Sequence, residues 1–430
     1  MRLTRRFFLR STGAMAVYCA VNPLDAALAA SMDDPAAHVT AKNKTLVVVF
    51  LRGGIDGLNL VVPHGDPAYA KLRPGIGVAA PGKEGGALDL DGFFGMNPRA
   101  AALMPALASG EAIALQAVGY PGNSRSHFEE QDVWETGVSG NTMGHDGWLN
   151  RHLLTSTGHG PIRAVALSDS LPRILRGEAP AFAFPGLTDL GFGGRGNAEQ
   201  EASVVAALEQ AHAAVAPGGT RDAIDLVHAA GRETLEGVKV LRGVAAQPYE
   251  QSASYPSGQL GQRLASAARL IKAGVGLEVV QIDYGGWDTH NRQGDGAQGN
   301  FGTKVEELCG SLAAFSEDLG PRSDDTLVLT LSDFGRTARQ NGTAGTDHGW
   351  ANAMLAMGGP VAAKKALDPG RGPVMGAWPG LGPEQLHQKR DLKHTTDFRD
   401  VLAEVVTSHL GNANLPKVLP GHAFSPVGLL

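Results

Sequence analysis

The chain has 430 residues, of which 43% are hydrophobic, so it can bury one large core or two ordinary ones and is not a disordered protein. Its formal net charge is −6 and it has no long basic run, which argues against nucleic acid as a partner. The 58 glycines and 25 prolines favour a loop-rich α/β fold over a helical bundle.

The first 30 residues are typical of a targeting segment. Residues 4–10 (TRRFFLR) resemble a twin-arginine export signal, a weakly apolar stretch follows at 14–21, and residues 27–29 (ALA) offer a cleavage pattern. The alternative is a helix with a chance arginine pair. We expect export by the twin-arginine translocase to the periplasm or the medium, and removal of residues 1–30 lowers the net charge by three, to −9.

The chain contains two cysteines, and Cys19 lies in the segment that we expect to be removed. Cys309 then has no partner, so the mature chain is expected to lack an intramolecular disulfide. No later run approaches the roughly 18 apolar residues of a membrane-spanning helix, so no transmembrane segment is expected in the mature chain.

Hydrophobic periodicity predicts alternating strands and helices over most of the mature chain. The expected strands are residues 45–51, 112–118, 277–282, 327–331 and 352–358, with short strands within 161–196. The expected helices are residues 98–109 with a kink at Pro105, one beginning at 126, and 197–216, 220–244, 258–273, 301–318 and 398–410. The strand at 45–51 (TLVVVFL) is uninterrupted and β-branched, as in a buried parallel strand. Residues from about 197 to 257 are expected to form a helical insertion or cap.

Carboxylates and histidines follow several of these strands. Asp56 lies in the glycine-rich turn RGGIDGLN after the first strand, where the glycines alone are also consistent with a simple turn. Asp288 and His290 are two residues apart, a spacing that places both on one face of an extended segment. Ligands of open α/β sheets bind at the carboxyl ends of the strands, and Asp with His is a plausible metal pair.

The strand at 327–331 is followed by Asp333 and, after a loop, by Asp347 and His348. These residue types bind divalent metals, although a lone Asp at a strand end is more often a turn or cap residue. We therefore interpret residues 326–349 as one wall of a metal site to which the other strand ends contribute ligands.

Ser126 follows the strand at 112–118, and Glu129 comes three residues later, which is a capping-box pattern. A helix N-terminus offers free N–H groups to a phosphate or sulfate, and a hydroxyl there is well placed as a nucleophile or metal ligand. The alternative is that Ser126 only caps the helix.

Together these motifs resemble a large bacterial family, domain-of-unknown-function family 1501. The resemblance rests on RGGIDGLN, SRSHFEEQDVWETG, GWDTH, SDFGRT and TDHGW, and extends from about residue 45 to the C-terminus as a single domain. It implies the alkaline phosphatase and sulfatase superfamily, an α/β fold whose mostly parallel central sheet has helices on both faces and metal ligands at the strand ends.

The resemblance also implies roles for the strand-end residues. Asp56 and Asp333 would bind one ion, beside which Ser126 would act as nucleophile. The second ion would be held by Asp288 and His290 together with His348, next to Asp347 in the Asp-His pair. The implied cofactor is one or two divalent ions, with Zn, Mn and Ca all conceivable.

The chain departs from the superfamily pattern at three points. Phe334 replaces the usual histidine after Asp333, so one ion lacks a nitrogen ligand. The spacing from Asp288 to His290 is shorter than in the phosphatases, and Ser126 lies outside the Cys/Ser-x-Pro-x-Arg motif of the sulfatases. A single metal, an altered metal and a site without catalysis all remain open.

Two main functions follow from these patterns. The first is an exported, metal-dependent hydrolase of small phosphate or sulfate esters, in which Arg125 or Arg336 binds the ester oxygens; both arginines are equally compatible with ordinary ion pairs. The second is an exported binding or assembly protein that keeps the fold without the chemistry. A metal-free Ser/His/Asp hydrolase is less consistent with the sequence, because no G-x-S-x-G turn surrounds Ser126.

Overall fold

A computed structural model describes residues 16–18, 43–187, 206–208, 210, 212 and 223–430. Most of the predicted export signal and of the predicted helix at 197–216 lie outside the described residues. No helix in the described part of the chain is long and apolar enough to cross a membrane.

A central sheet runs through the molecule in the order β1-β8-β7-β9-β2-β10-β11-β6-β12, with β13 also pairing with β6. Its strands are β1 (Ala16–Tyr18), β2 (Thr45–Leu51), β6 (Ala112–Gly119), β7 (Ala164–Leu167), β8 (Ala181–Ala183), β9 (Val279–Tyr284), β10 (Thr326–Ser332), β11 (Asn352–Gly358), β12 (Val374–Met375) and β13 (Thr396–Asp397). β9, β2 and β10 pair in parallel, and β11 is antiparallel to both β10 and β6. The carboxyl ends of β2, β6, β9 and β10 therefore lie at the same edge of the sheet.

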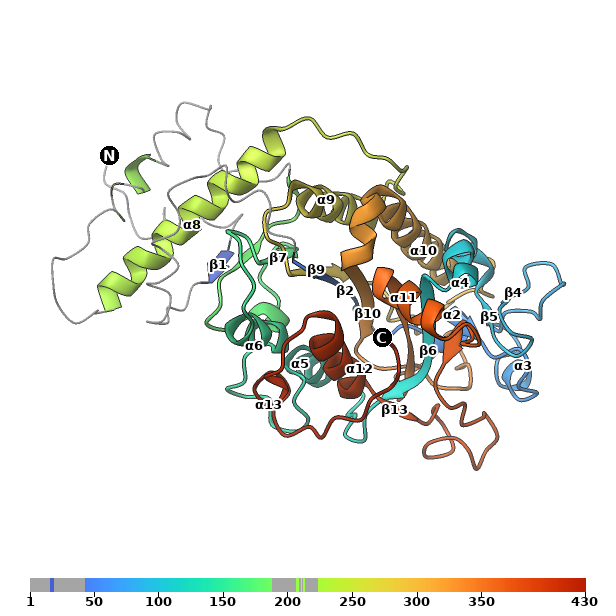
Figure 1. Cartoon of the computed structure of the whole chain (residues 1–430). Helices are drawn as coiled ribbons and strands as arrows, with labels where there is room; N and C mark the ends of the chain where they lie inside the picture. The colour runs from blue at the N-terminus through green and yellow to red at the C-terminus, as the bar shows by residue number, and fades with distance from the viewer. Residues whose placement is uncertain (1–15, 19–42, 188–205, 209, 211, 213–222) are drawn as a thin grey trace.

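Helices cover both faces of this sheet (Figure 1). On one face lie α9 (Gln259–Ala273) and α10 (Asn300–Leu319), and on the other lie α5 (His127–Thr136), α6 (Trp148–Thr155) and α12 (Phe398–Glu404). β2 shows why two layers are needed: Val47 and Val49 pack into the core with α9 and α10, whereas Val48 packs into the core with α5, α6 and α12. Alternate residues of a strand point to opposite faces, so a strand that is apolar at every position needs a cover on both.

The remaining elements are short or peripheral. They are α2 (Gly57–Leu60), α3 (Tyr69–Leu72), α4 (Met104–Ser109), α8 (Ala223–Ala246), α11 (Gly359–Leu367), α13 (Leu415–Val418) and the small sheet of β3 (Val61–Val62), β4 (Leu88–Asp89) and β5 (Gly95–Met96). The expected helical insertion at about 197–257 is described from α8 onward and at a few residues before α8.

The predicted α/β fold, with a mostly parallel sheet and helices on both faces, is confirmed. The strands predicted at 45–51 and 352–358 have the predicted bounds, whereas β9 begins two residues later than expected. The predicted break near Pro105 is present as a change from a 3₁₀ helix, Pro98–Leu103, to α4. The closing helix ends in a π-helical turn, Val405–His409, which the sequence pattern did not indicate.

Candidate metal centre

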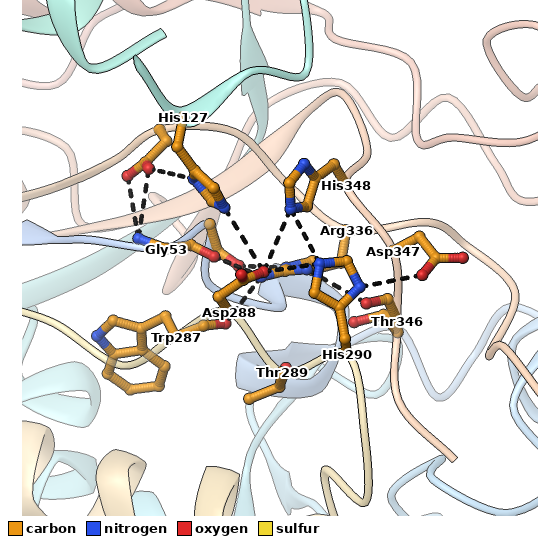
Figure 2. A network of polar contacts seen from close by, with 12 residues as sticks. Gly53, His127, Trp287, Asp288, Thr289, His290, Arg336, Thr346, Asp347 and His348 are labelled. Carbon is orange, nitrogen blue, oxygen red and sulfur yellow. Dashed lines mark hydrogen bonds and ion pairs between the residues drawn. The ribbon is translucent and has the colours of Figure 1, made fainter. Parts of the chain in front are cut away.

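Loops after four strands of the central sheet lie close together at its carboxyl edge. They contribute Gly53 after β2, His127 at the first position of α5 after β6, Asp288 and its neighbours after β9, and the residues from Asp333 to His348 after β10. Figure 2 shows that the imidazoles of His127, His290 and His348 and the guanidinium of Arg336 converge on the carboxylate of Asp288.

Two glycines after β2 let the loops approach one another closely. Gly53 has a φ of +114°, and a Cβ there would lie 2.6 Å from the backbone nitrogen of Asp288. Gly54 has a φ of +67°, and its Cβ would lie 2.8 Å from the ring of Phe334. The Gly53 N–H also donates to the two carboxylate oxygens of Asp333, at 3.2 and 3.3 Å. Any larger residue at either position would push the loops apart.

Three imidazoles face the carboxylate of Asp288. Its Oδ1 lies 3.0 Å from Nε2 of His290 and 3.2 Å from Nε2 of His348. Nε2 of His127 lies 3.5 Å from the same oxygen. Ligand atoms of His127, Asp288 and His348 all lie within 4.8 Å of one another. We call these four residues the His–Asp cluster.

The other ring nitrogen of each imidazole has its own oxygen acceptor. Nδ1 contacts Asp333 Oδ2 at 2.6 Å in His127, Asp347 Oδ1 at 3.0 Å in His290, and the carbonyl oxygen of Arg125 at 2.8 Å in His348. A carbonyl or carboxylate can only accept, so Nδ1 carries the proton in each ring. In a neutral ring the Nε2 then has a lone pair toward Asp288, and in a protonated ring it donates to that carboxylate.

Those lone pairs make the cluster a fitting place for a cation. Nε2 of His290 and Nε2 of His348 are only 3.0 Å apart, so two lone pairs and a carboxylate repel one another unless a proton or a metal ion lies between them. Nε2 of His127 is buried and has no hydrogen-bond partner. Three imidazole nitrogens and one carboxylate oxygen also match the ligand types of zinc.

Burial and neighbouring charges shift the pKa values within the cluster. Burial acts to raise the pKa of Asp288, but the hydrogen bond and charge of Arg336 outweigh it and lower that pKa, so the carboxylate is ionised. Burial lowers the pKa of His348, which keeps its imidazole neutral. Burial also acts to lower the pKa of His127, but its bond to Asp333 outweighs that effect and raises the pKa.

Arg336, a candidate for binding ester oxygens, is buried and fully engaged. Its guanidinium donates to the carbonyl oxygens of Gly53, Gly54, Trp287 and Thr346 and, at 2.5 Å, to Asp288 Oδ1. Arg336 therefore ties the loops after β2, β9 and β10 together and neutralises Asp288, and it offers nothing to a ligand.

Arg125, the second candidate, is also held by an ion pair. Its guanidinium contacts Oδ2 of the buried Asp391 at 2.6 and 2.9 Å and lies 5.4 Å above the ring of Trp350. Its backbone has a φ of +61°, and its carbonyl oxygen accepts the Nδ1 proton of His348. The backbone of Arg125, rather than its charge, contributes to the cluster.

Asp56 lies in a separate buried network and not in the His–Asp cluster. Its Oδ2 accepts from Arg73 Nη1 at 2.5 Å and from Gln293 Nε2 at 2.6 Å, and both members of the ion pair are fully buried. Arg73 also donates to the backbone carbonyl oxygens of Thr337 and Ala338. The charge of Asp56 is balanced by a guanidinium, so this carboxylate does not require a metal.

Asp333 and Phe334 support the cluster from one side. Asp333 accepts from His127 and, at 2.9 Å, from Gln131 Nε2, so it orients an imidazole instead of facing Asp288 itself. The ring of Phe334 stacks on His127 with centroids 4.6 Å apart and lies 4.8 Å from the ring of His348. Phe334 therefore forms an apolar wall that limits how these two imidazoles can turn.

Ser126 is the N-cap residue of α5, as the sequence predicts, but its side chain makes no capping hydrogen bond. Glu129 lies in the first turn without the reciprocal contact of a capping box. Ser126 is partly exposed and directly precedes His127.

His127 is the cluster member that the sequence analysis missed. It stands in the motif SRSHFEE, next to the serine that drew attention as a nucleophile. Its position at the carboxyl edge of the sheet, one residue from a predicted helix start, was available as a signal. A histidine at this position is as good a candidate ligand as the histidines that follow β9 and β10.

Comparison with known proteins places the chain in a family. The model of the family described as "Protein of unknown function (DUF1501)" matches residues 93–414, which is well over half of the chain, so the chain belongs to this family. No curated protein matches it. One solved structure that matches is the PsFucS1 sulfatase from Pseudoalteromonas sp., 11% identical, with 87% of this chain and 68% of that chain covered and a TM-score of 0.35, a likeness that carries no information on activity.

The buried pair of Arg73 and Asp56 gives a stability prediction. Arg73→Met leaves the carboxylate of Asp56 buried without a counter-charge, and we expect it to cost about 3–5 kcal/mol of unfolding free energy in urea denaturation. Asp56→Asn added to Arg73→Met should recover part of that loss. Asp56→Asn alone should leave metal content unchanged. A loss of metal in this variant would show that Asp56 is a metal ligand.

Proposed function

We propose that this member of the DUF1501 family is an exported metalloenzyme that holds one divalent transition metal ion in its His–Asp cluster and hydrolyses phosphate or sulfate esters of small molecules. One observation carries the proposal: three imidazoles, each fixed through Nδ1 by an oxygen acceptor, aim Nε2 at a single carboxylate oxygen. Metal-binding histidines are oriented by such outer contacts, which also make the ligating nitrogen more basic.

The donor set favours zinc among the metals that the sequence left open. Three nitrogens and one carboxylate suit zinc and are compatible with manganese, whereas calcium prefers oxygen ligands. A single ion is favoured over two, because Asp56 is balanced by Arg73 and Asp333 is occupied by His127.

A zinc ion that keeps three cluster residues as ligands would leave its fourth position to a water, would lower the pKa of that water to about 7, and would polarise an ester oxygen. The residues around it keep fixed positions: Asp333 and Asp347 hold two of the imidazoles, and Phe334 keeps water from one side. The hydroxyl of Ser126 is not used in capping and precedes His127, so it is the side chain that we assign as nucleophile.

The ion pair between Arg336 and Asp288 favours a second candidate, an exported binding or assembly protein without chemistry. A buried guanidinium 2.5 Å from Asp288 already supplies positive charge to the cluster. In such a binding protein, a proton instead of a metal ion would relieve the repulsion between the Nε2 atoms of His290 and His348. Metal analysis and activity assays separate the two candidates.

Metal binding is the first test. The mature protein should contain about one equivalent of zinc by plasma mass spectrometry, and zinc at roughly 100 times its Kd should stabilise it by about 2.7 kcal/mol. His348→Ala should abolish this stabilisation, and Asp347→Ala, which frees only the outer nitrogen of His290, should weaken zinc affinity roughly 10–100-fold. His145→Ala, an exposed histidine in another loop, is the matched control. Equal zinc affinity in the His348→Ala protein would refute the metal assignment.

Ester hydrolysis is the second test, with 4-nitrophenyl phosphate and 4-nitrophenyl sulfate as substrates. We expect zinc-dependent turnover of at least one of them by the wild-type protein. Ser126→Ala should lower kcat by on the order of 10³-fold or more while zinc content stays at the wild-type level, because a nucleophile acts on the reacting atoms and not on the metal. Undiminished turnover by Ser126→Ala would show that water, and not Ser126, is the nucleophile. Full zinc occupancy without turnover of either ester would favour the binding protein.

Export is tested in the host cell. Lysine at both Arg5 and Arg6 should retain the precursor in the cytoplasm, since twin-arginine signals are read by that residue pair. The control with lysine at Arg2 and Arg10 carries the same number of changes and should be exported. Cell fractionation followed by immunoblotting distinguishes them, and equal export of both variants would contradict a twin-arginine signal.

A further inference from the structure

A basic hollow lies beside the His–Asp cluster. It is bounded by α3 and the residues just before it, by residues 337–341 in the loop after β10, and by residues 381–390, and its volume is about 650 Å³. Pockets that bind small organic ligands have volumes of roughly 300–1,000 Å³. The hollow is large enough to contain a complete small molecule.

Four cationic side chains line this hollow against a single carboxylate, in a chain whose net charge is negative. The cations are Lys71, Arg339, Lys389 and Arg390, and the carboxylate is Asp347. Lys389 lies 3.2 Å from Glu384, and Arg390 donates to the carbonyl oxygen of His348 at 2.8 Å. In the part of the chain that the structure describes, Lys71 and Arg339 form no ion pair.

The hollow and the cluster share residues. Asp347, which lines the hollow, also accepts the Nδ1 proton of His290, and Figure 2 shows it on the side of that imidazole away from Asp288. Arg390 holds the backbone of His348, a cluster member. A molecule in the hollow would therefore lie next to the cluster, with the carboxylate of Asp347 between it and His290.

The lining is not only charged. Leu72, Leu381 and Leu386 contribute apolar surface, and Leu381 is almost completely buried. A site with apolar walls and a few convergent cations suits an organic body that carries an oxyanion, in which the walls contact the body and the cations contact the oxyanion. Arginine is well suited to the oxyanion because its planar fork can pair with two oxygens at once.

We propose that this hollow binds an organic oxyanion, a molecule with an apolar or ring-shaped body and a sulfate, sulfonate, phosphate or carboxylate group that Lys71 and Arg339 neutralise. Its role as part of a substrate site rests on the proposed function, and would favour esters with a second anionic group over esters such as 4-nitrophenyl phosphate. Binding of the oxyanion in the hollow does not require that the cluster catalyses a reaction. It also supplies the anion recognition that neither Arg125 nor Arg336 can provide.

Binding of 1-naphthalenesulfonate to the full mature chain, followed by the fluorescence of the naphthalene ring, tests this proposal. We expect Lys71→Ala combined with Arg339→Ala to weaken binding at least 10-fold, and both residues are exposed, so the fold should be kept. Lys83→Ala combined with Lys417→Ala removes the same charge from exposed positions outside the hollow and should leave the Kd unchanged. 1-Naphthalenemethanol, which has the ring without the charge, should bind at least 10-fold more weakly than the sulfonate.

The same measurement with zinc-loaded and metal-free protein separates the hollow from the cluster. Binding that depends on Lys71 and Arg339 in both forms supports the proposal, even where the wild-type protein hydrolyses no ester. Binding that requires zinc and is unaffected by the double substitution would place the sulfonate at the cluster and overturn the proposal. Equal binding of the sulfonate and the alcohol would overturn it as well.

Discussion

The electrostatic balance around Asp288 is the constraint on which the rest of the site depends. A carboxylate whose pKa is lowered by Arg336 faces three Nε2 atoms, and the Nδ1 of each of these rings donates to another oxygen. Arg336 can approach from one side only, because its other contacts fix it to the loops after β2, β9 and β10. On the opposite side, the Nε2 atoms of His290 and His348 lie 3.0 Å apart and need a proton or a metal ion between them. The cluster is therefore a rigid frame whose donor atoms are compatible with a divalent metal ion.

The sheet that carries this frame could be predicted well because its strands are buried on both faces. An uninterrupted apolar run such as residues 45–51 has few alternatives to a central parallel strand, and its ends are marked by Thr45 and by the glycines after Arg52. Shorter elements were missed because two-residue strands such as β12 and β13 exist only through their pairing with β6. The π-helical turn before Gly411 was missed for a similar reason, since His409 there bonds to the carbonyl oxygen of Thr45, a contact that periodicity does not encode.

Residue types at the strand ends located the site but did not give the partners of each side chain. Asp288, His290 and His348 were expected to converge, and the structure brings them together. Asp56 was expected to join them, yet its partner is Arg73, which lies in a stretch where the sequence predicts no helix or strand. Asp and His look the same in a sequence whether they face a ligand or orient a neighbour, so Asp333 was assigned to a metal although it holds His127. Only the fold distinguishes these roles.

The departures from the two-ion pattern implied by the sequence resemblance have a common physical cause. A second ion would need Asp56, Asp333 and a nitrogen ligand at position 334. In this chain Arg73 supplies the positive charge that Asp56 requires, and the proton on Nδ1 of His127 satisfies Asp333. The apolar ring at position 334 packs on His127 and His348 without leaving a buried polar atom unpaired. Phe334 therefore limits how two imidazoles of the cluster can turn, and the single ion proposed above needs no ligand from this position.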